Sequence, residues 1–147
     1  MKAPLILLML LIGFVLTLHL AMNAQVGSLV KNPRMANALF WAIGAATAII
    51  IGFTGWDPAF FTKLKEVPVW LFTAGAMGGA LVFGIAWAMP KLGAGTAFVL
   101  LIAGQVISGM IFSHFGLLGS PVEPISMIKV IGVILLVAGA AIVTLAK

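Results

Sequence analysis

Five long apolar runs constrain this chain more than any other feature of its sequence. A helix needs about 20 predominantly apolar residues to cross the hydrocarbon core of a bilayer. Runs of that kind, almost free of charged residues, occupy residues 4–22, 35–56, 69–89, 93–115 and 125–146. The sequence therefore predicts an all-α integral membrane protein, a bundle of five transmembrane helices forming a single membrane domain over residues 1–147.

The composition excludes several classes of protein. With 63% hydrophobic and 7% charged residues, a water-soluble domain would expose too much apolar surface. The net charge of +5 does not indicate nucleic acid binding, because the basic residues lie singly or in pairs between the apolar runs. We expect the lipid bilayer, and not a nucleic acid, to be the partner of this surface.

The residue types also argue against an enzyme. Cysteine is absent, which excludes disulfides, thiolate metal sites and thiol nucleophiles. The sequence shows no pair of catalytic acids, no metal-ligand cluster, no nucleophile with a base and no phosphate-binding glycine loop. We therefore expect no catalytic activity, no metal and no cofactor.

The first apolar run has an alternative interpretation. Lys2 followed by apolar residues up to Leu18 resembles a secretory signal peptide. No small-x-small cleavage site follows, and four further apolar runs require membrane insertion in any case. We expect the run to remain as the first span.

Positive charge shows no preference for either side of the membrane. Five spans divide Lys and Arg into two groups, on the amino-terminal side Lys2, Lys63, Lys65 and Lys129, and on the other side Lys31, Arg34, Lys91 and Lys147. Since Lys and Arg in short loops set orientation, four against four predicts dual topology, although a fixed orientation remains open. Two copies in opposite orientations would form an antiparallel dimer, the ten-helix inverted-repeat architecture of secondary transporters.

A few polar side chains interrupt the apolar runs, whereas every Asp and Glu lies in a connection. His19 and Asn23 are four residues apart and share one helix face. Such groups usually face a bundle interior or a wet cavity, so we expect Gln105 to point inward as well. Gln105 can line a solute pathway or only join helices by a hydrogen bond of about 0.6 kcal/mol. His19 can be a proton-linked group or a neutral hydrogen-bonded one.

Aromatic and small residues suggest further roles. Trp41 and Trp87 lie within or near the ends of spans and are candidates for a pocket, whereas Trp56 and Trp70 are placed as interface anchors. His114 ends the fourth run, where we expect a structural role in capping backbone carbonyls. Small residues recur four apart and predict helix-packing faces: Gly44, Ala48 and Gly52, then Gly75 and Gly79, then Gly104 and Ser108.

Three segments carry a resemblance to a known family. They are "MNAQVGSLVKNPRMANALFWAIG", "VPVWLFTAGAMGGALVFGIAWAMPKLGAGTAFVLLIAGQ" and "SHFGLLGSPVEPISMIKVIGVILLVAG", and together they extend over nearly the whole chain. In their order and spacing they resemble the YdcZ-type family of the drug/metabolite transporter superfamily. The resemblance depends on Asn23, Pro33, Gly44, Trp70, Gly75, Gly78, residues 90–93, Gly104, Gln105 and residues 114–119.

The resemblance implies half of a ten-helix transporter in the cytoplasmic (inner) membrane. We expect a secondary transporter of a small metabolite or related compound, working by alternating access as a homodimer or paired with a similar five-helix protein. The expected solute pathway comprises His19, Asn23, Trp41, Trp87, Gln105 and Ser108. Structural or gating roles are expected for Pro33, Gly75, Gly78, Pro90, Gly93, Gly104, His114 and Gly116.

Two departures and one alternative stay open. Ser113 stands where the family commonly carries an acid, and His19 stands where glutamine is common, so the coupling ion is undecided. The alternative function is a membrane interaction or accessory protein that carries no solute, which the short loops and few polar groups would suit.

Overall fold

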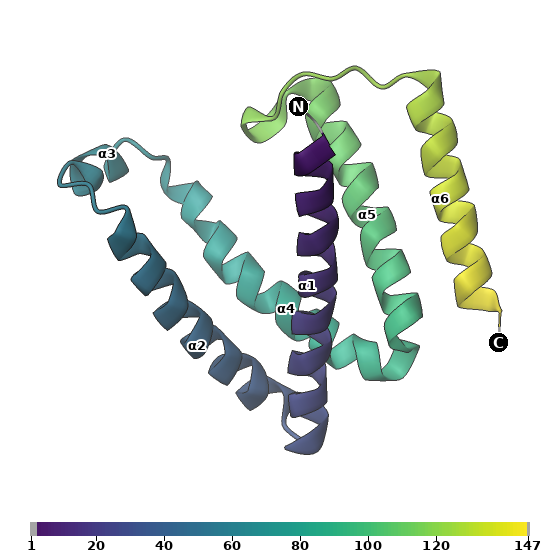
Figure 1. Ribbon diagram of the computed structural model, residues 1–147, viewed down its shortest axis with the longest axis horizontal. Helices are drawn as coiled ribbons and strands as arrows, with labels where there is room; N and C mark the ends of the chain where they lie inside the picture. Colours follow the sequence, from purple (N-terminus) through teal and green to yellow (C-terminus); the bar gives the residue numbers. More distant parts are fainter. Residues whose placement is uncertain (1–2, 147) are drawn as a thin grey trace. The chain divides into compact units, whose positions relative to one another are not determined.

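The computed structural model describes residues 3–146, which form helices and no strand. In chain order the elements are α1 (Ala3–Leu29), α2 (Pro33–Thr54), α3 (Phe60–Leu64), the 3-10 helix η1 (Val69–Phe72), α4 (Thr73–Leu92), α5 (Ala94–Phe115), the 3-10 helix η2 (Leu117–Gly119) and α6 (Met127–Leu145) (Figure 1). Within this part of the chain, five helical stretches are long and apolar enough to cross a membrane, the third being Val69–Leu92. The predicted all-α membrane fold with five spans is confirmed.

Two helix ends differ from the expected ones. Helix α1 continues to Leu29, so Asn23 and Gln25 lie inside it, because a helix can extend beyond the point where its sequence stops being apolar. Its 27 residues give a length of about 40 Å, more than the roughly 30 Å hydrocarbon core, so α1 either tilts or reaches into the interface. Helix α4 runs through Pro90 to Leu92, which leaves Gly93, at φ 84°, as the connection to α5.

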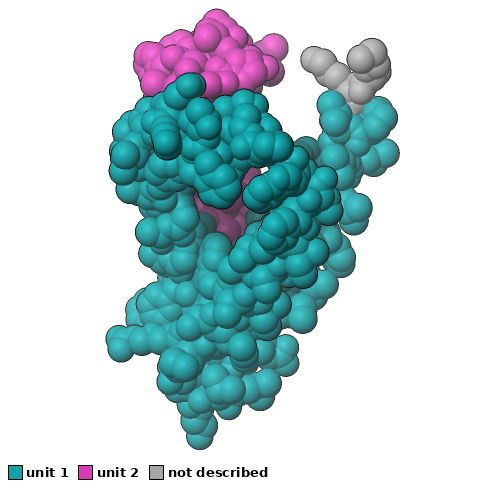
Figure 2. Space-filling view, turned by 90° about the vertical axis from the view of Figure 1, so that its left-hand side faces the viewer, with its two compact units in different colours: residues 1–91 teal, residues 92–147 magenta. Residues whose placement is uncertain are grey.

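The chain forms two compact units, unit 1 (Met1–Lys91) and unit 2 (Leu92–Lys147), coloured separately in Figure 2. In unit 1, α1 packs against α2 through a tight turn. The backbone N–H of Asn32 donates to the Gly27 carbonyl at 3.1 Å. The side-chain oxygen of Asn32 accepts the backbone N–H of Met35 at 3.2 Å, which caps α2 just before Pro33. A methyl group on Gly27 would lie 3.2 Å from the Cα of Pro33, so glycine permits this close approach.

The connection between α2 and α4 is held by Asp57. Its carboxylate accepts the backbone N–H of Ala59 at 2.9 Å and pairs with the Lys63 ammonium at 2.8 Å. The Lys63 ammonium, and after it the Ala59 amide, hold the pKa of Asp57 below its ordinary value. The exposed rings of Trp56 and Phe61 meet edge to face beside this turn, as expected of a segment at the lipid interface.

Unit 2 is a hairpin in which α5 and α6 pack side by side (Figure 1). Helix α5 ends at Phe115 and is capped by Gly116, whose φ of 62° is left-handed. The chain then turns back so that the backbone N–H of Glu123 donates to the Ser113 carbonyl at 2.9 Å. Glu123 also pairs with Lys129 at 3.1 Å, and Ser126 caps α6. Hydrogen bonds and an ion pair therefore hold the segment between α5 and α6 in place.

Replacing Gly116 with alanine should loosen this hairpin. A side chain at φ 62° is strained by about 1 kcal/mol or more, and its Cβ would lie 2.9 Å from Cγ2 of Val122. We expect G116A to lower the unfolding temperature in detergent by about 2–4 °C. The control is G109A, at a helical glycine with open space around it, which should change the unfolding temperature little. Equal shifts for the two variants would contradict this account of the turn.

Candidate functional site

Three helices of unit 1 are joined by a short chain of amide groups. Asn23 on α1 donates from Nδ2 to Oδ1 of Asn37 on α2, a long bond of 3.5 Å. Asn37 in turn donates from Nδ2 to the backbone carbonyl of Gly79 on α4 at 3.2 Å. This amide chain, Asn23, Asn37 and the Gly79 carbonyl, connects α1 to α4 through α2.

Asn23 is the most deeply buried polar side chain of the described residues, with none of its surface exposed. Its Oδ1 atom has no hydrogen-bond partner within the described part of the chain. A buried polar atom without a partner costs about 1–3 kcal/mol. The single bond from Nδ2 to Asn37 therefore satisfies only part of the Asn23 amide. The prediction that Asn23 points into the protein matches its burial.

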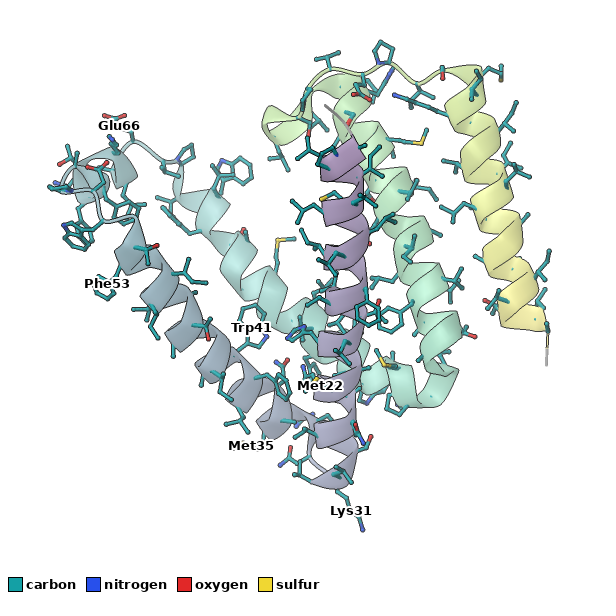
Figure 3. All side chains as sticks on the ribbon, viewed as in Figure 1. Met22, Lys31, Met35, Trp41, Phe53 and Glu66 are labelled. Carbon is teal, nitrogen blue, oxygen red and sulfur yellow. The ribbon has the colours of Figure 1, made fainter. Side chains whose placement is uncertain are left out.

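Glycine allows α2 and α4 to meet beside the amide chain. Trp41 lies one turn after Asn37 on α2, and Gly78 precedes Gly79 on α4. A methyl group on Gly78 would lie 3.1 Å from Cη2 of Trp41, so the indole occupies the space that a side chain at Gly78 would need. Figure 3 shows Trp41 directed from α2 toward α4. Trp41 stays 40% exposed.

The remaining predicted pathway residues of unit 1 are exposed. His19 packs its ring edge to face against Phe40, with centroids 6.0 Å apart, and lines a shallow apolar groove along α1 together with Leu16. Trp87 is 53% exposed and carries the Lys91 ammonium over its ring, 3.0 Å from the centroid. His19 and Asn23 therefore lie in different environments despite their spacing of four residues.

The polar residues of α5 in unit 2 lie on its surface. Gln105 and Ser108 are exposed, and neither side chain has a hydrogen-bond partner within residues 3–146. Gly104 beside them has open space at its Cβ position. Of the residues on α5, Ala103 alone is buried.

His114 takes part in the turn that follows α5. Its Nδ1 atom accepts the backbone N–H of Ile125 at 3.1 Å, so the ring holds the returning chain. The expected contact was different, a bond from the ring to backbone carbonyls of the helix. His114 therefore links the end of α5 to the segment that precedes α6.

The expected glycine and proline positions fall into two groups. Pro33 begins α2, Pro90 lies in the last turn of α4, and Gly93 and Gly116 have the positive φ angles described above. The small-residue faces behave differently, because a Cβ at Gly44, Gly52, Gly75, Gly79 or Gly104 would meet nothing within 4 Å. Close helix approach occurs at Gly27 and Gly78 instead.

Sequence reasoning missed Asn37. A signal was present, since Asn37 is a polar residue near the start of an apolar run and lies one helical turn before Trp41. The rule that singled out Asn23 and Gln105 applies equally to it. Asn37 links Asn23 to α4 and is the central member of the amide chain.

Comparison with known proteins identifies the family. The family model described as "Putative inner membrane exporter, YdcZ" matches residues 4–142. The chain belongs to this family. It is accordingly an integral inner membrane protein of a transporter family, as the resemblance of its motifs predicted. No curated protein and no solved structure matches the chain.

The amide chain predicts energetic coupling between Asn23 and Asn37. In a double-mutant cycle of N23A and N37A, the interaction free energy of unfolding in detergent should be about 0.6 kcal/mol, as for other hydrogen bonds between membrane helices. N37A alone should cost more than this coupling, because it also removes the bond to the Gly79 carbonyl.

The matched control combines N37A with Q25A. Gln25 is an amide on the same helix as Asn23, but it is exposed. Its coupling to Asn37 should be zero. A coupling to Gln25 as large as that to Asn23 would contradict the amide chain.

Proposed function

We propose that this chain is half of an exporter, a secondary transporter that moves a small metabolite or related compound across the inner membrane by alternating access. Membership of a family of inner membrane exporters is the observation that carries this proposal. Five membrane-spanning stretches agree with half of a ten-helix inverted-repeat transporter. The chain then needs a second copy, or a similar five-helix protein, to complete the passage.

The balance of positive charge supports an antiparallel pair. Four Lys or Arg residues fall on each side of the membrane, so neither orientation is favoured. Lys2 and Lys147, one in each group, lie outside the described residues. Uncovered small-residue faces, such as that of Gly44 and Gly52 on α2, would allow helices of a second copy to approach closely.

The exposed polar and aromatic groups are the proposed contacts for the solute. Gln105 and Ser108 on α5, and Trp41, Trp87 and His19 in unit 1, each keep surface that no other part of their unit covers. An unpaired amide in a membrane span gains by hydrogen bonding to a solute or to water. We assign the solute-binding role first to Gln105.

Asn23 has a different place in the proposal. Its side chain is wholly buried and bonded to Asn37, so it is closed to solute in this conformation. It contacts solute in the proposed cycle only when the amide chain opens. Until then Asn23 holds α1 against α2 while the exposed groups do the binding.

A transport assay in proteoliposomes tests the role of Gln105. A thermal-shift screen of metabolites in detergent supplies the solute, because bound ligand raises apparent stability. With that solute, Q105A should lower counterflow about 5- to 10-fold, the loss of roughly one hydrogen bond. Q25A, which removes an exposed amide outside the pathway, should transport normally. Equal counterflow by wild type and Q105A would remove Gln105 from the pathway.

A reporter at the carboxyl terminus tests the antiparallel pair. Dual insertion predicts reporter signal from both sides of the membrane, since the two orientations are equally favoured. Signal from one side only would contradict the antiparallel homodimer. Copurification of a stoichiometric foreign subunit, without self-association, would instead favour an accessory protein.

A further inference from the structure

A small pocket with basic and aromatic walls lies in unit 1, where the α1–α2 turn meets α4. Its volume is about 320 Å³. The lining residues are Lys31, Asn32, Pro33, Arg34, Phe83 and Trp87. Trp87 is the one residue that the pocket shares with the proposed solute pathway, and lipid binding there does not depend on transport.

Positive charge gathers at this end of unit 1. The beginning of α2 and the end of α4 bring Lys31, Arg34 and Lys91 to the same end of the two helices, with no acidic residue among them. Asp57 and Glu66 follow α2 and precede α4, so they belong to the opposite end. The two ion pairs of the described residues, Lys63 with Asp57 and Lys129 with Glu123, lie elsewhere. The charge of the pocket is therefore not neutralised by these acids.

The aromatic wall gives the pocket an apolar side. Phe83 and Trp87 are four residues apart and share a face of α4. The Lys91 ammonium lies over the Trp87 ring at 3.0 Å, which positions the charge without cancelling it. Arg34 adds a planar guanidinium that can bind two phosphate oxygens at once. Lys31 extends from the end of the unit in Figure 3.

We infer that this pocket binds the phosphate group of an anionic phospholipid. The cations stand at the ends of membrane-spanning helices, the depth at which lipid phosphates lie. The aromatic residues continue from that level along α4, where the glycerol and the first carbons of the acyl chains would lie. A soluble phosphate would use the cations alone, whereas a phospholipid uses both the basic and the aromatic walls.

Lipid titration of the full chain in detergent, followed by native mass spectrometry, tests this inference. The probes are phosphatidylglycerol and phosphatidylcholine with identical acyl chains. Wild type should bind phosphatidylglycerol more tightly. Removing two cations in the R34Q/K91Q variant should weaken that binding about 25-fold, or about 5-fold for each cation. R34K with Lys91 intact should retain the preference in large part.

Controls separate the site from net charge and from soluble anions. K63Q/K65Q removes the same charge at the opposite end of the helices and should bind phosphatidylglycerol like wild type. Equal binding of both lipids by wild type would overturn the inference, and so would equal weakening by the two double variants. Displacement of phosphatidylglycerol by equimolar inorganic phosphate would also overturn it, since the ligand would then be a soluble phosphate. The comparison of the two lipids on the wild-type protein tests the inference even if a variant fails to fold.

Discussion

A polar group inside a membrane has to find its hydrogen-bond partner within protein, because hydrocarbon offers none. In unit 1 the amide chain that runs from Asn23 through Asn37 to the Gly79 carbonyl gives a partner to Nδ2 of both asparagines, while Oδ1 of Asn23 has none among the described residues. Each bond joins two different helices, so the chain defines how α1, α2 and α4 stand against one another. Small residues permit the approach, with Gly27 facing the start of α2 and Gly78 facing the Trp41 indole.

The polar groups that are not part of this chain divide into two kinds. Some hold connections, as His114 does by accepting the Ile125 amide and Asp57 does by accepting the Ala59 amide. Others, Gln105 above all, remain exposed on a membrane-spanning helix. In the proposed exporter, the first kind keeps each unit rigid, and the second kind meets the solute. Alternating access is largely rigid-body rocking of one such half against another, and the proposed exporter would use each unit in this way.

Much of the fold could be predicted from the sequence, because length and hydrophobicity alone decide whether a helix can cross a bilayer. The end of α1 could not, since the apolar run stops at Met22 while the backbone hydrogen bonding continues to Leu29. Similarly, the third apolar run stops at residue 89, while α4 continues through Pro90 to Leu92. Proline removes one backbone donor from the helix, and only two further residues of α4 follow it.

The site was harder to predict than the spans. Burial of Asn23 followed from the cost of a polar group in hydrocarbon, but its partner Asn37 depends on which helices pack together, and hydropathy carries no such information. Regular spacing of small residues does not say which of them meet a neighbour within a unit, since Gly44 and Gly75 have open space around them while Gly27 and Gly78 make close approaches. Identifying a packing glycine requires knowing which side chain faces it, such as Trp41 at Gly78.

The amide chain itself is open to direct observation, because the protein has three asparagines, Asn23, Asn32 and Asn37. Solid-state NMR of asparagine-labelled protein in lipid bilayers resolves their side-chain amides. We expect a through-space contact between the Asn23 and Asn37 side-chain amides and slow hydrogen exchange at both, while the exposed Asn32 side-chain amide exchanges quickly. Absence of that contact, with equally fast exchange at all three amides, would contradict the amide chain.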